Sequence, residues 1–290
     1  MHGIKYINAL CDIIPESGVV MAETLFSPKK LRMDFFSKFF PYDEELANII
    51  DIKQTAGIKK KEENHSFLKK PMWQNMHIYL VEYLLAFSRK WFNRNDLSIL
   101  DWGCGKCHVS YLLKKRNVDV ASCDIETTEH VDSAFGQYTP IADFAKINVI
   151  PLRHEYLLPF DNETFDVVLS FGVLEHVPSD TQSLAEINRI LKPNGLFFCF
   201  WLPYKYSWKQ KREQLKGGHY HNRLYDIKKI SHLLNETKYN LLDYWYRDLL
   251  PKRYAPPFYR AMENFDNWLC RNTFVKYFAS NIEFVANKIG

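Results

Sequence analysis

The stretch from Ser98 to Cys107 constrains this chain more than any other. It reads S-I-L-D-W-G-C-G-K-C, a short apolar run that ends in Asp101 and is followed by a turn containing Gly103 and Gly105. Glycine lets the backbone turn sharply and approach a ligand, and the following helix offers unpaired N–H groups. About 20 residues on, a second apolar run ends in Asp124, where a carboxylate can accept hydrogen bonds from ribose hydroxyls. The pattern favours a site for a ribose-containing cofactor.

Short apolar runs alternate with helical patterns from Leu97 onward. This alternation is typical of an α/β fold, in which helices cover both faces of a parallel sheet. The predicted strands are Ser98–Leu100, Val118–Cys123, Asn148–Ile150, Phe165–Ser170, Leu196–Leu202, Leu241–Tyr246 and Ile282–Ala286.

Helices are predicted between these strands and ahead of the first one. Apolar residues from Met76 to Trp91 recur at helical spacing. Ser179 and Gln182 form a capping-box pair, and Pro193 with Gly195 ends the helix that follows. A further helix is expected over Asp226–Asn235. Residues 1–70 lack sustained periodicity and are interpreted as an N-terminal extension to a domain over 71–290.

Length and composition indicate a soluble enzyme. The 290 residues are 47% hydrophobic, which is enough for a full core, and the net charge of +4 does not point to nucleic acid. The N-terminus shows no secretory pattern, and the apolar window Ile78–Phe87 is too short to span a bilayer. The expected location is the cytoplasm, with peripheral contact to the inner membrane as an alternative.

The paired cysteines of the turn allow two rival interpretations. Cys104-Gly105-Lys106-Cys107-His108 has the spacing of a covalent haem site, and the cysteine pair also suits redox or zinc chemistry. Haem attachment normally requires export, and a redox pair leaves Asp101 and Asp124 unexplained. We favour cysteines that merely fill a tight turn, and we predict no metal site.

Five stretches in this order resemble the class I S-adenosylmethionine-dependent methyltransferases, in particular the type 11 group with small-molecule, lipid and sugar acceptors. They are I-L-D-W-G-C-G at Ile99–Gly105, C-D-I at Cys123–Ile125, L-P-F-D-N-E-T-F-D-V-V-L-S at Leu158–Ser170, V-L-E-H-V at Val173–Val177 and E-I-N-R-I-L-K-P-N-G at Glu186–Gly195. The resemblance implies a Rossmann-like three-layer sandwich with a seven-stranded, mostly parallel sheet whose last strand is antiparallel.

The resemblance also implies a set of residues around S-adenosylmethionine. Its methionine end would meet Asp101, Gly103 and Gly105, its ribose Asp124 and its adenine Ile125. Ser170 and Phe171 would border the sulfonium. This chain departs from the family twice. Cys107 stands where a third glycine is usual, and His154 and Glu155 stand where an Asp usually contacts the adenine.

Methyl transfer from a sulfonium is an in-line displacement, so alignment of the acceptor supplies most of the catalysis. If the acceptor is a hydroxyl, His176 is the predicted base, because it follows the fourth strand at the ligand-binding edge. A structural role for the Glu-His pair is the alternative. The segment 203–225 is rich in aromatic and basic residues and is predicted to be an acceptor lid. Its candidate substrate-binding residues are Tyr204, His219, Tyr220 and His221.

The last region, about 252–278, is predicted to be a helical insertion that docks on the domain or rests on a membrane surface. The whole pattern looks like methyltransferases of bacterial surface polysaccharide or glycolipid synthesis. We therefore expect O-methylation of a sugar, glycolipid or other small acceptor. The alternatives are a quinone- or lipid-type C- or O-methyltransferase and a non-catalytic binding protein with this fold, and a nucleic-acid substrate is disfavoured.

Overall fold

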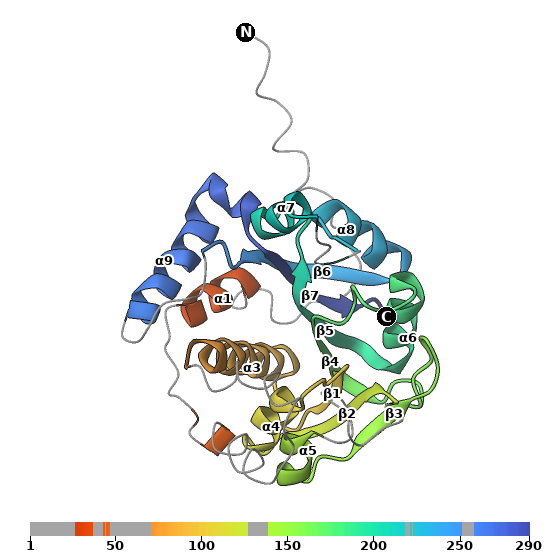
Figure 1. Cartoon of the computed structure of the whole chain (residues 1–290). Coiled ribbons are helices and arrows are strands. Elements are labelled where there is room, and N and C mark those ends of the chain that lie inside the picture. The colour runs from red at the N-terminus through yellow and green to blue at the C-terminus, as the bar shows by residue number, and fades with distance from the viewer. Residues whose placement is uncertain are drawn as a thin grey trace.

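The computed structural model describes residues 27–36, 43, 45–46, 71–126, 139–217, 221, 223–250 and 258–290. Its centre is a seven-stranded sheet, drawn across the middle of Figure 1. The strands are β1 (Ser98–Trp102), β2 (Asp119–Ile125), β3 (Val149–Leu152), β4 (Phe165–Phe171), β5 (Leu191–Pro203), β6 (Tyr239–Arg247) and β7 (Asn281–Lys288). Each predicted strand is present, with bounds that differ by a few residues.

The strand order is β3-β2-β1-β4-β5-β7-β6. The strands from β1 to β5 pair in parallel, whereas β7 pairs antiparallel with both β5 and β6. This confirms the Rossmann-like sandwich with an antiparallel last strand. The carboxyl ends of β1, β2 and β4 therefore meet at one edge of the sheet, where ligands bind in folds of this kind.

Helices cover both faces of the sheet (Figure 1). They are α3 (Pro71–Phe92), α4 (His108–Lys114) and α5 (Pro140–Ala145) on one face, and α6 (Asp180–Ile190) and α8 (Ile227–Glu236) on the other. Successive strand residues point to opposite faces. Ile99 accordingly packs in the core under α3 and α4, while its neighbour Leu100 packs in the core under α6 and α8.

The predicted start of α6 is confirmed, and its end is earlier than expected. Ser179 is the N-cap, and its side chain accepts a hydrogen bond from the N–H of Gln182 at 3.2 Å. The helix ends at Ile190, three positions before Pro193, because Leu191 already pairs with Phe165 as the first residue of β5.

The remaining elements lie around the end of the sheet formed by β6 and β7. They are α1 (Pro28–Phe36), α7 (Trp208–Leu215), α9 (Phe258–Asn272) and the short 3₁₀ helix η3 (Phe274–Phe278). The part of residues 1–70 that is described packs on the domain, since Arg32 Nε lies 2.7 Å from Asp243 Oδ2 on β6 and Leu46 is buried. None of the described helices combines the length and the apolar character needed to cross a membrane.

Candidate active site

The glycine turn after β1 is held against the end of β2. The N–H groups of Gly103 and Cys104 both donate to the carbonyl oxygen of Cys123, at 2.9 and 3.0 Å. Gly103 has a φ of +69°, and a Cβ atom there would lie 2.5 Å from Cγ2 of Val173. Both the left-handed backbone and the lack of space therefore require glycine at this position.

Cys107 occupies the position where the family usually has glycine, and it adopts the backbone conformation that glycine favours. Its φ is 60° and its ψ is 14°, directly before the first residue of α4. A residue other than glycine costs about 1 to 2 kcal/mol in this conformation. Cys107 is buried, and its Sγ lies 3.6 Å from that of Cys104. The cysteines within the described residues are free thiols, and Cys11 lies outside them.

Asp124 closes the turn from the neighbouring strand. Its Oδ2 accepts a hydrogen bond from the N–H of Gly105 at 2.6 Å, and its Oδ1 accepts one from the N–H of Ile125 at 2.7 Å. Burial raises the pKa of Asp124, and the two N–H donors oppose that rise. A carboxylate has about four lone-pair sites, so two remain for the hydroxyls of a ribose.

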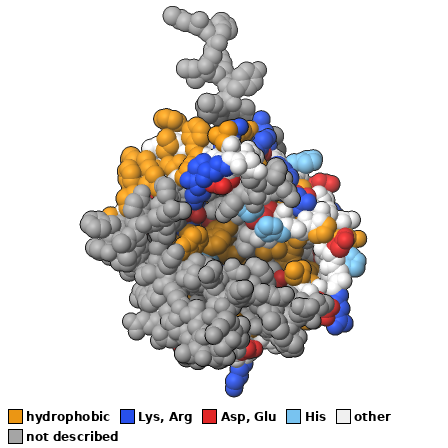
Figure 2. Space-filling view, viewed as in Figure 1, with side chains coloured by type: hydrophobic (Ala, Val, Ile, Leu, Met, Phe, Trp, Pro, Cys, Tyr) orange, Lys and Arg blue, Asp and Glu red, His pale blue; other side chains and the backbone are white. Residues whose placement is uncertain are grey.

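A cavity of about 670 Å³ opens at this edge of the sheet. Figure 2 shows the molecule from one side, with hydrophobic and histidine side chains gathered near the centre of the view. Most of the predicted cofactor residues line the cavity: Gly103, Gly105, Asp124, Ile125, His154, Glu155 and Phe171. Ile125 is 65% exposed, so an apolar surface is available for a flat ring. The volume of the cavity and the hydrogen-bond donors and acceptors that line it fit a nucleoside cofactor.

Two predicted cofactor residues, Asp101 and Ser170, are fully buried and line neither this cavity nor the next one. Asp101 Oδ2 accepts a hydrogen bond from Ser110 Oγ of α4 at 2.5 Å, which ties the start of that helix to β1. Burial raises the pKa of Asp101 to about 7. Asp101 therefore connects β1 to α4, the two elements on either side of the turn. Its direct contact with the cofactor stays a prediction.

His154 and Glu155 both line the cavity, but they offer different hydrogen-bonding groups to a ligand. His154 Nδ1 accepts hydrogen bonds from the N–H groups of Tyr156 and Leu157 at 3.3 and 3.1 Å. A neutral His154 therefore carries its proton on Nε2 and offers a donor. An adenine amino group requires an acceptor, so Glu155 is the candidate for that contact.

A second cavity, of about 270 Å³, adjoins the first. Phe171, Gly172 and His176 line both cavities, so they form the boundary between them. Two of the predicted acceptor residues, Tyr204 and His221, line the second cavity. His219 and Tyr220 lie outside the described residues.

Several residues of the second cavity were not predicted. Trp73 comes from α3, and Trp201 comes from a bulge in β5 where its φ is 64°. The two indole rings meet edge to face, with centroids 5.8 Å apart. Glu175, beside the predicted base, also lines the cavity. A clue to Trp73 was its place on the helical repeat before β1, but only packing between α3 and β5 brings the two tryptophans together.

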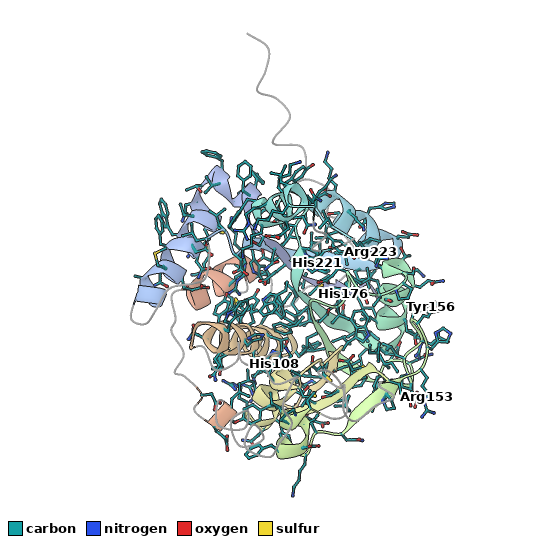
Figure 3. The ribbon with its side chains drawn as sticks, viewed as in Figure 1. His108, Arg153, Tyr156, His176, His221 and Arg223 are labelled. Atoms are coloured by element: carbon teal, nitrogen blue, oxygen red, sulfur yellow. The ribbon has the colours of Figure 1, made fainter. Side chains whose placement is uncertain are left out.

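Two histidines of the second cavity, both labelled in Figure 3, lie close together. The ring centroids of His176 and His221 are 5.7 Å apart. Burial lowers the pKa of both imidazoles, and the neighbouring His176 lowers that of His221 further. Both rings are therefore mainly neutral near pH 7, and a neutral imidazole can accept a proton.

Arg223 holds the loop that carries His176. Its guanidinium donates to the carbonyl oxygens of Val177 at 2.6 Å, Pro178 at 3.0 Å and Leu174 at 3.3 Å. Figure 3 labels this side chain together with the two histidines. The end of the predicted lid is thus attached to the loop between β4 and α6.

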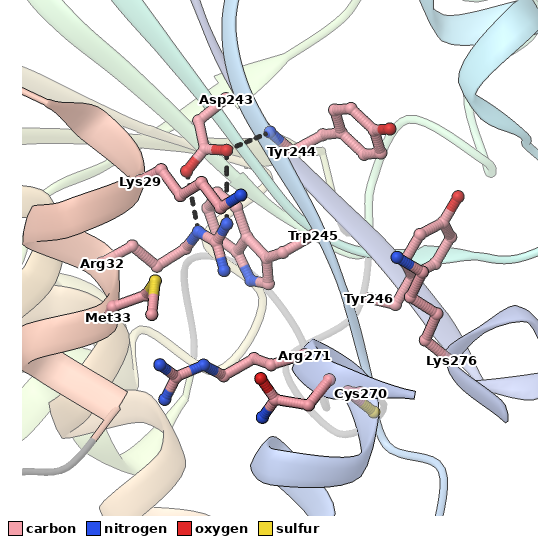
Figure 4. A pocket seen from close by; sticks show the side chains of 11 residues that line it. Lys29, Arg32, Met33, Asp243, Tyr244, Trp245, Tyr246, Cys270, Arg271 and Lys276 are labelled. Atoms are coloured by element: carbon pink, nitrogen blue, oxygen red, sulfur yellow. Dashed lines mark hydrogen bonds and ion pairs between the residues drawn. The ribbon is translucent and has the colours of Figure 1, made fainter. Parts of the chain in front are cut away.

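A third cavity, of about 350 Å³, lies between α1, β6 and the end of α9 (Figure 4). The Arg32 and Asp243 ion pair forms part of its wall, together with Lys29, Arg271 and Lys276. No residue that lines it lines either of the two cavities described above. It is therefore separate from the candidate active site.

The parallel sheet, the glycine turn and the acidic end of β2 define a Rossmann-like nucleoside-binding domain. Comparison with known proteins gives the particular family. Residues 100–199 match the family model described as a methyltransferase domain. This region is therefore a class I S-adenosylmethionine-dependent methyltransferase domain, which confirms the resemblance noted in the sequence, and S-adenosylmethionine is the cofactor of this enzyme class.

Several curated proteins are similar to a part of this chain. A probable S-adenosylmethionine-dependent methyltransferase of Mycolicibacterium smegmatis is 27% identical over 129 residues, which cover 39% of this chain and 46% of the relative. A ubiquinone biosynthesis O-methyltransferase of Maricaulis maris is 33% identical over 112 residues, which cover 36% of this chain and 39% of the relative. The mitochondrial arginine-hydroxylase NDUFAF5 of Mus musculus is 33% identical over 98 residues, which cover 34% of this chain and 26% of the relative.

The chain thus spans less than half the length of each of these relatives. Among solved structures, a putative sarcosine dimethylglycine methyltransferase of Galdieria sulphuraria is similar to this chain, with a TM-score of 0.48 and 14% sequence identity. That similarity covers 73% of this chain and 85% of the other.

Proposed function

We propose that this protein transfers the methyl group of S-adenosylmethionine to an oxygen atom of a small acceptor. The observation that carries the proposal is the pair of adjoining cavities, which share Phe171, Gly172 and His176. One cavity has the size and the lining for a nucleoside cofactor, and the other is smaller and lined in part by aromatic rings. Reactants in the two cavities would meet at the shared boundary, as an in-line displacement requires.

The turn residues would hold the cofactor. The backbone at Gly103 and Gly105 can approach the ligand closely, and Asp124 keeps free lone pairs for hydroxyl groups. S-adenosylmethionine, when bound, supplies an electrophilic methyl group. Phe171 and Gly172 border the cavity at the place where that group would be presented.

His176 would remove the proton of the acceptor hydroxyl. It lies on the boundary between the cavities, and burial lowers the pKa of its imidazole, so the proton-accepting form predominates at neutral pH. The deprotonated oxygen is the stronger nucleophile.

The acceptor class follows from the walls of the second cavity. Trp73, Trp201 and Tyr204 present aromatic surface, on which the ring of a sugar or a phenol can stack. A sugar or glycolipid, as expected for bacterial surface polysaccharide synthesis, fits this description. A quinone-type phenol is the second candidate, favoured by the ubiquinone biosynthesis O-methyltransferase among the relatives.

Methyl transfer from labelled S-adenosylmethionine tests the proposal. Sugars, glycolipids, phenols and small-molecule extracts are offered, and products are identified by their gain of one methyl group. We expect transfer by the wild type and its loss in His176→Ala. Cofactor binding without transfer to any acceptor would instead favour the non-catalytic alternative.

A further inference from the structure

We propose that Glu175, His176 and His221 bind one divalent transition-metal ion in the second cavity. Each of the three side chains offers one ligand atom, and these atoms all lie within 4.8 Å of one another. Glu175 and His176 come from the loop after β4, and His221 comes from the segment after α7. The sequence did not predict this site, because His221 is separated from the other two residues by α6, β5 and α7.

The distances between the ligand atoms are close to what a metal ion needs. Glu175 Oε1 lies 3.8 Å from His176 Nε2. Zinc is bound at about 2.0 to 2.2 Å by nitrogen and oxygen ligands, which places neighbouring ligand atoms roughly 3 to 3.5 Å apart. Side-chain movements of about 1 Å would therefore bring the three atoms around one ion.

An oxygen atom of Glu175 that has no partner among the described residues is the observation that points to a bound ion. Its side chain is 3% exposed, and its Oε2 atom has no hydrogen-bond partner within the part of the chain that the structure describes. An unpartnered buried carboxylate oxygen is costly. The nearby cation Arg223 does not supply the missing partner, because its N–H groups are directed to the carbonyl oxygens of Leu174, Val177 and Pro178.

The two histidines are in the form that binds metals. Burial lowers the pKa of both imidazoles, so neither ring needs to lose a proton near pH 7 before it coordinates an ion. Burial also raises the pKa of Glu175 to about 7, and a bound cation would stabilise its ionised form.

The set of ligands favours some ions over others. Two imidazoles and one carboxylate suit Zn²⁺, Co²⁺, Fe²⁺ or Mn²⁺, whereas Mg²⁺ and Ca²⁺ prefer oxygen ligands alone. Three protein ligands also leave at least one coordination position open. Because the site lies in the second cavity, that position is accessible to an acceptor molecule.

The role of the ion rests on the proposed function. An acceptor oxygen that binds the open position would have its pKa lowered, as metal-bound water does. Its O–H bond would break and the proton would pass to solvent water. The oxygen would then take the methyl group as the bond from that carbon to the sulfonium sulfur breaks, and S-adenosylhomocysteine would leave. With the ion bound, His176 acts through the ion and not as a free base. Turnover still requires its unprotonated imidazole, because a histidine must be neutral to bind a metal. The matching substrate class is a phenol or hydroxyl compound with a second oxygen beside the first, so that both can bind the ion.

Titration of the metal-stripped protein with Co²⁺ and Zn²⁺ tests the site. Calorimetry gives the affinity and the number of ions, and the Co²⁺ absorption spectrum reports the ligand atoms. We expect one ion bound through nitrogen and oxygen. Glu175→Gln and His221→Ala should each weaken binding more than about 100-fold, which exceeds the usual cost of losing an outer-shell partner. His232→Ala is the matched control, because His232 is an exposed histidine paired with Glu236 on α8.

The outcomes separate this proposal from its rivals. Absence of saturable binding, or equal binding by the wild type and both variants, would overturn it. Thiolate charge-transfer bands in the Co²⁺ spectrum would also overturn it, by assigning the ion to Cys104 and Cys107 instead. Binding of S-adenosylhomocysteine is measured on every variant as a check on folding. If the metal-stripped protein binds S-adenosylhomocysteine and still transfers methyl groups, the metal proposal fails and the proposed function stands.

Discussion

At the scale of single residues, Gly103 is the part of the site with the least freedom to change. Alanine there must adopt a φ of +69°, and its Cβ atom would approach Val173. The backbone conformation costs about 1 to 2 kcal/mol and overpacking about 1 to 3 kcal/mol, so we expect Gly103→Ala to destabilise the protein by about 2 to 5 kcal/mol. Denaturant unfolding measures this loss.

Two further variants separate these causes. Gly217 also has a positive φ, of 76°, but a Cβ atom there meets nothing within 4 Å, so Gly217→Ala should cost only the backbone term. Adding Val173→Ala to Gly103→Ala should restore part of the stability, so that the double variant is more stable than the two single losses predict. Equal losses for Gly103→Ala and Gly217→Ala would show that the contact with Val173 is unimportant.

The pH dependence of turnover tests the role of His176. Burial lowers its pKa below the usual value of 6.5, and proton abstraction needs the unprotonated ring. The rate should therefore be full at neutral pH and should fall as the pH drops through a midpoint below 6.5. His176→Ala should lower the rate by about 10²- to 10⁴-fold and remove this limb. A midpoint above 6.5, or loss of the limb in the control His232→Ala, would contradict the assignment.

The sequence predicted the site residues that belong to local motifs and missed those brought in by packing. Gly103, Gly105, Asp124 and Ile125 line the first cavity, and they could be named because a glycine turn and a strand end are both encoded within a few residues. Their contacts with the cofactor stay predictions. Trp73 reaches the second cavity only through the packing of α3 against the sheet. A single sequence carries no direct signal for such a contact.

At the scale of elements, the loop between β4 and α6 depends on Arg223 for its position. Replacing Arg223 by Met removes three hydrogen bonds to loop carbonyls but retains much of the apolar stem. Because small displacements of a reacting group can cost about 10²-fold, we expect a fall in turnover of roughly 10- to 100-fold. Cofactor affinity should change little. Steady-state kinetics and calorimetry measure the two effects.

The control for this variant is Arg212→Met on α7. Arg212 is a half-exposed side chain that pairs with Glu213 at 3.0 Å, and no hydrogen bond joins it to the loop in the described part of the chain. Turnover by Arg212→Met should equal that of the wild type. If Arg223→Met were as active as Arg212→Met, the loop would not need this anchor.

The elements themselves were largely predictable, and their arrangement around β6 was less so. Buried parallel strands are short continuous apolar runs, which is why the strands β1 to β5 could be located. The helix α1 was not predicted within residues 1–70. Its contact with the sheet depends on Arg32 and Asp243, which are 211 positions apart, and on no local pattern.

At the scale of the whole molecule, a buried ion pair joins the last two strands and α9. Arg247 is 2% exposed, with its guanidinium 3.8 Å from Glu283 of β7 and 3.4 Å from Glu263 of α9. Removing one member of a buried pair leaves the other charge uncompensated and costs about 3 to 5 kcal/mol. We expect Arg247→Met to lower the free energy of unfolding by this amount, as measured in denaturant.

Neutralising the partner should recover part of that loss. In the double variant Arg247→Met, Glu283→Gln, no uncompensated Glu283 charge remains, and the Trp245 indole, 2.6 Å from Glu283 Oε2, can still donate to the amide oxygen. A double variant that is less stable than Arg247→Met alone would contradict this explanation.

The most direct test of the whole account is calorimetric binding of S-adenosylhomocysteine to the wild type, Asp124→Ala and Asp119→Ala. Asp124 lines the cofactor cavity at the end of β2, whereas Asp119 is an exposed carboxylate at the start of the same strand. Hydrogen bonds to a charged group contribute about 1.5 to 3 kcal/mol, so Asp124→Ala should bind roughly 10- to 150-fold more weakly, and Asp119→Ala should bind like the wild type. A wild type with no affinity for this ligand, or an Asp124→Ala variant that binds it equally well, would contradict the account.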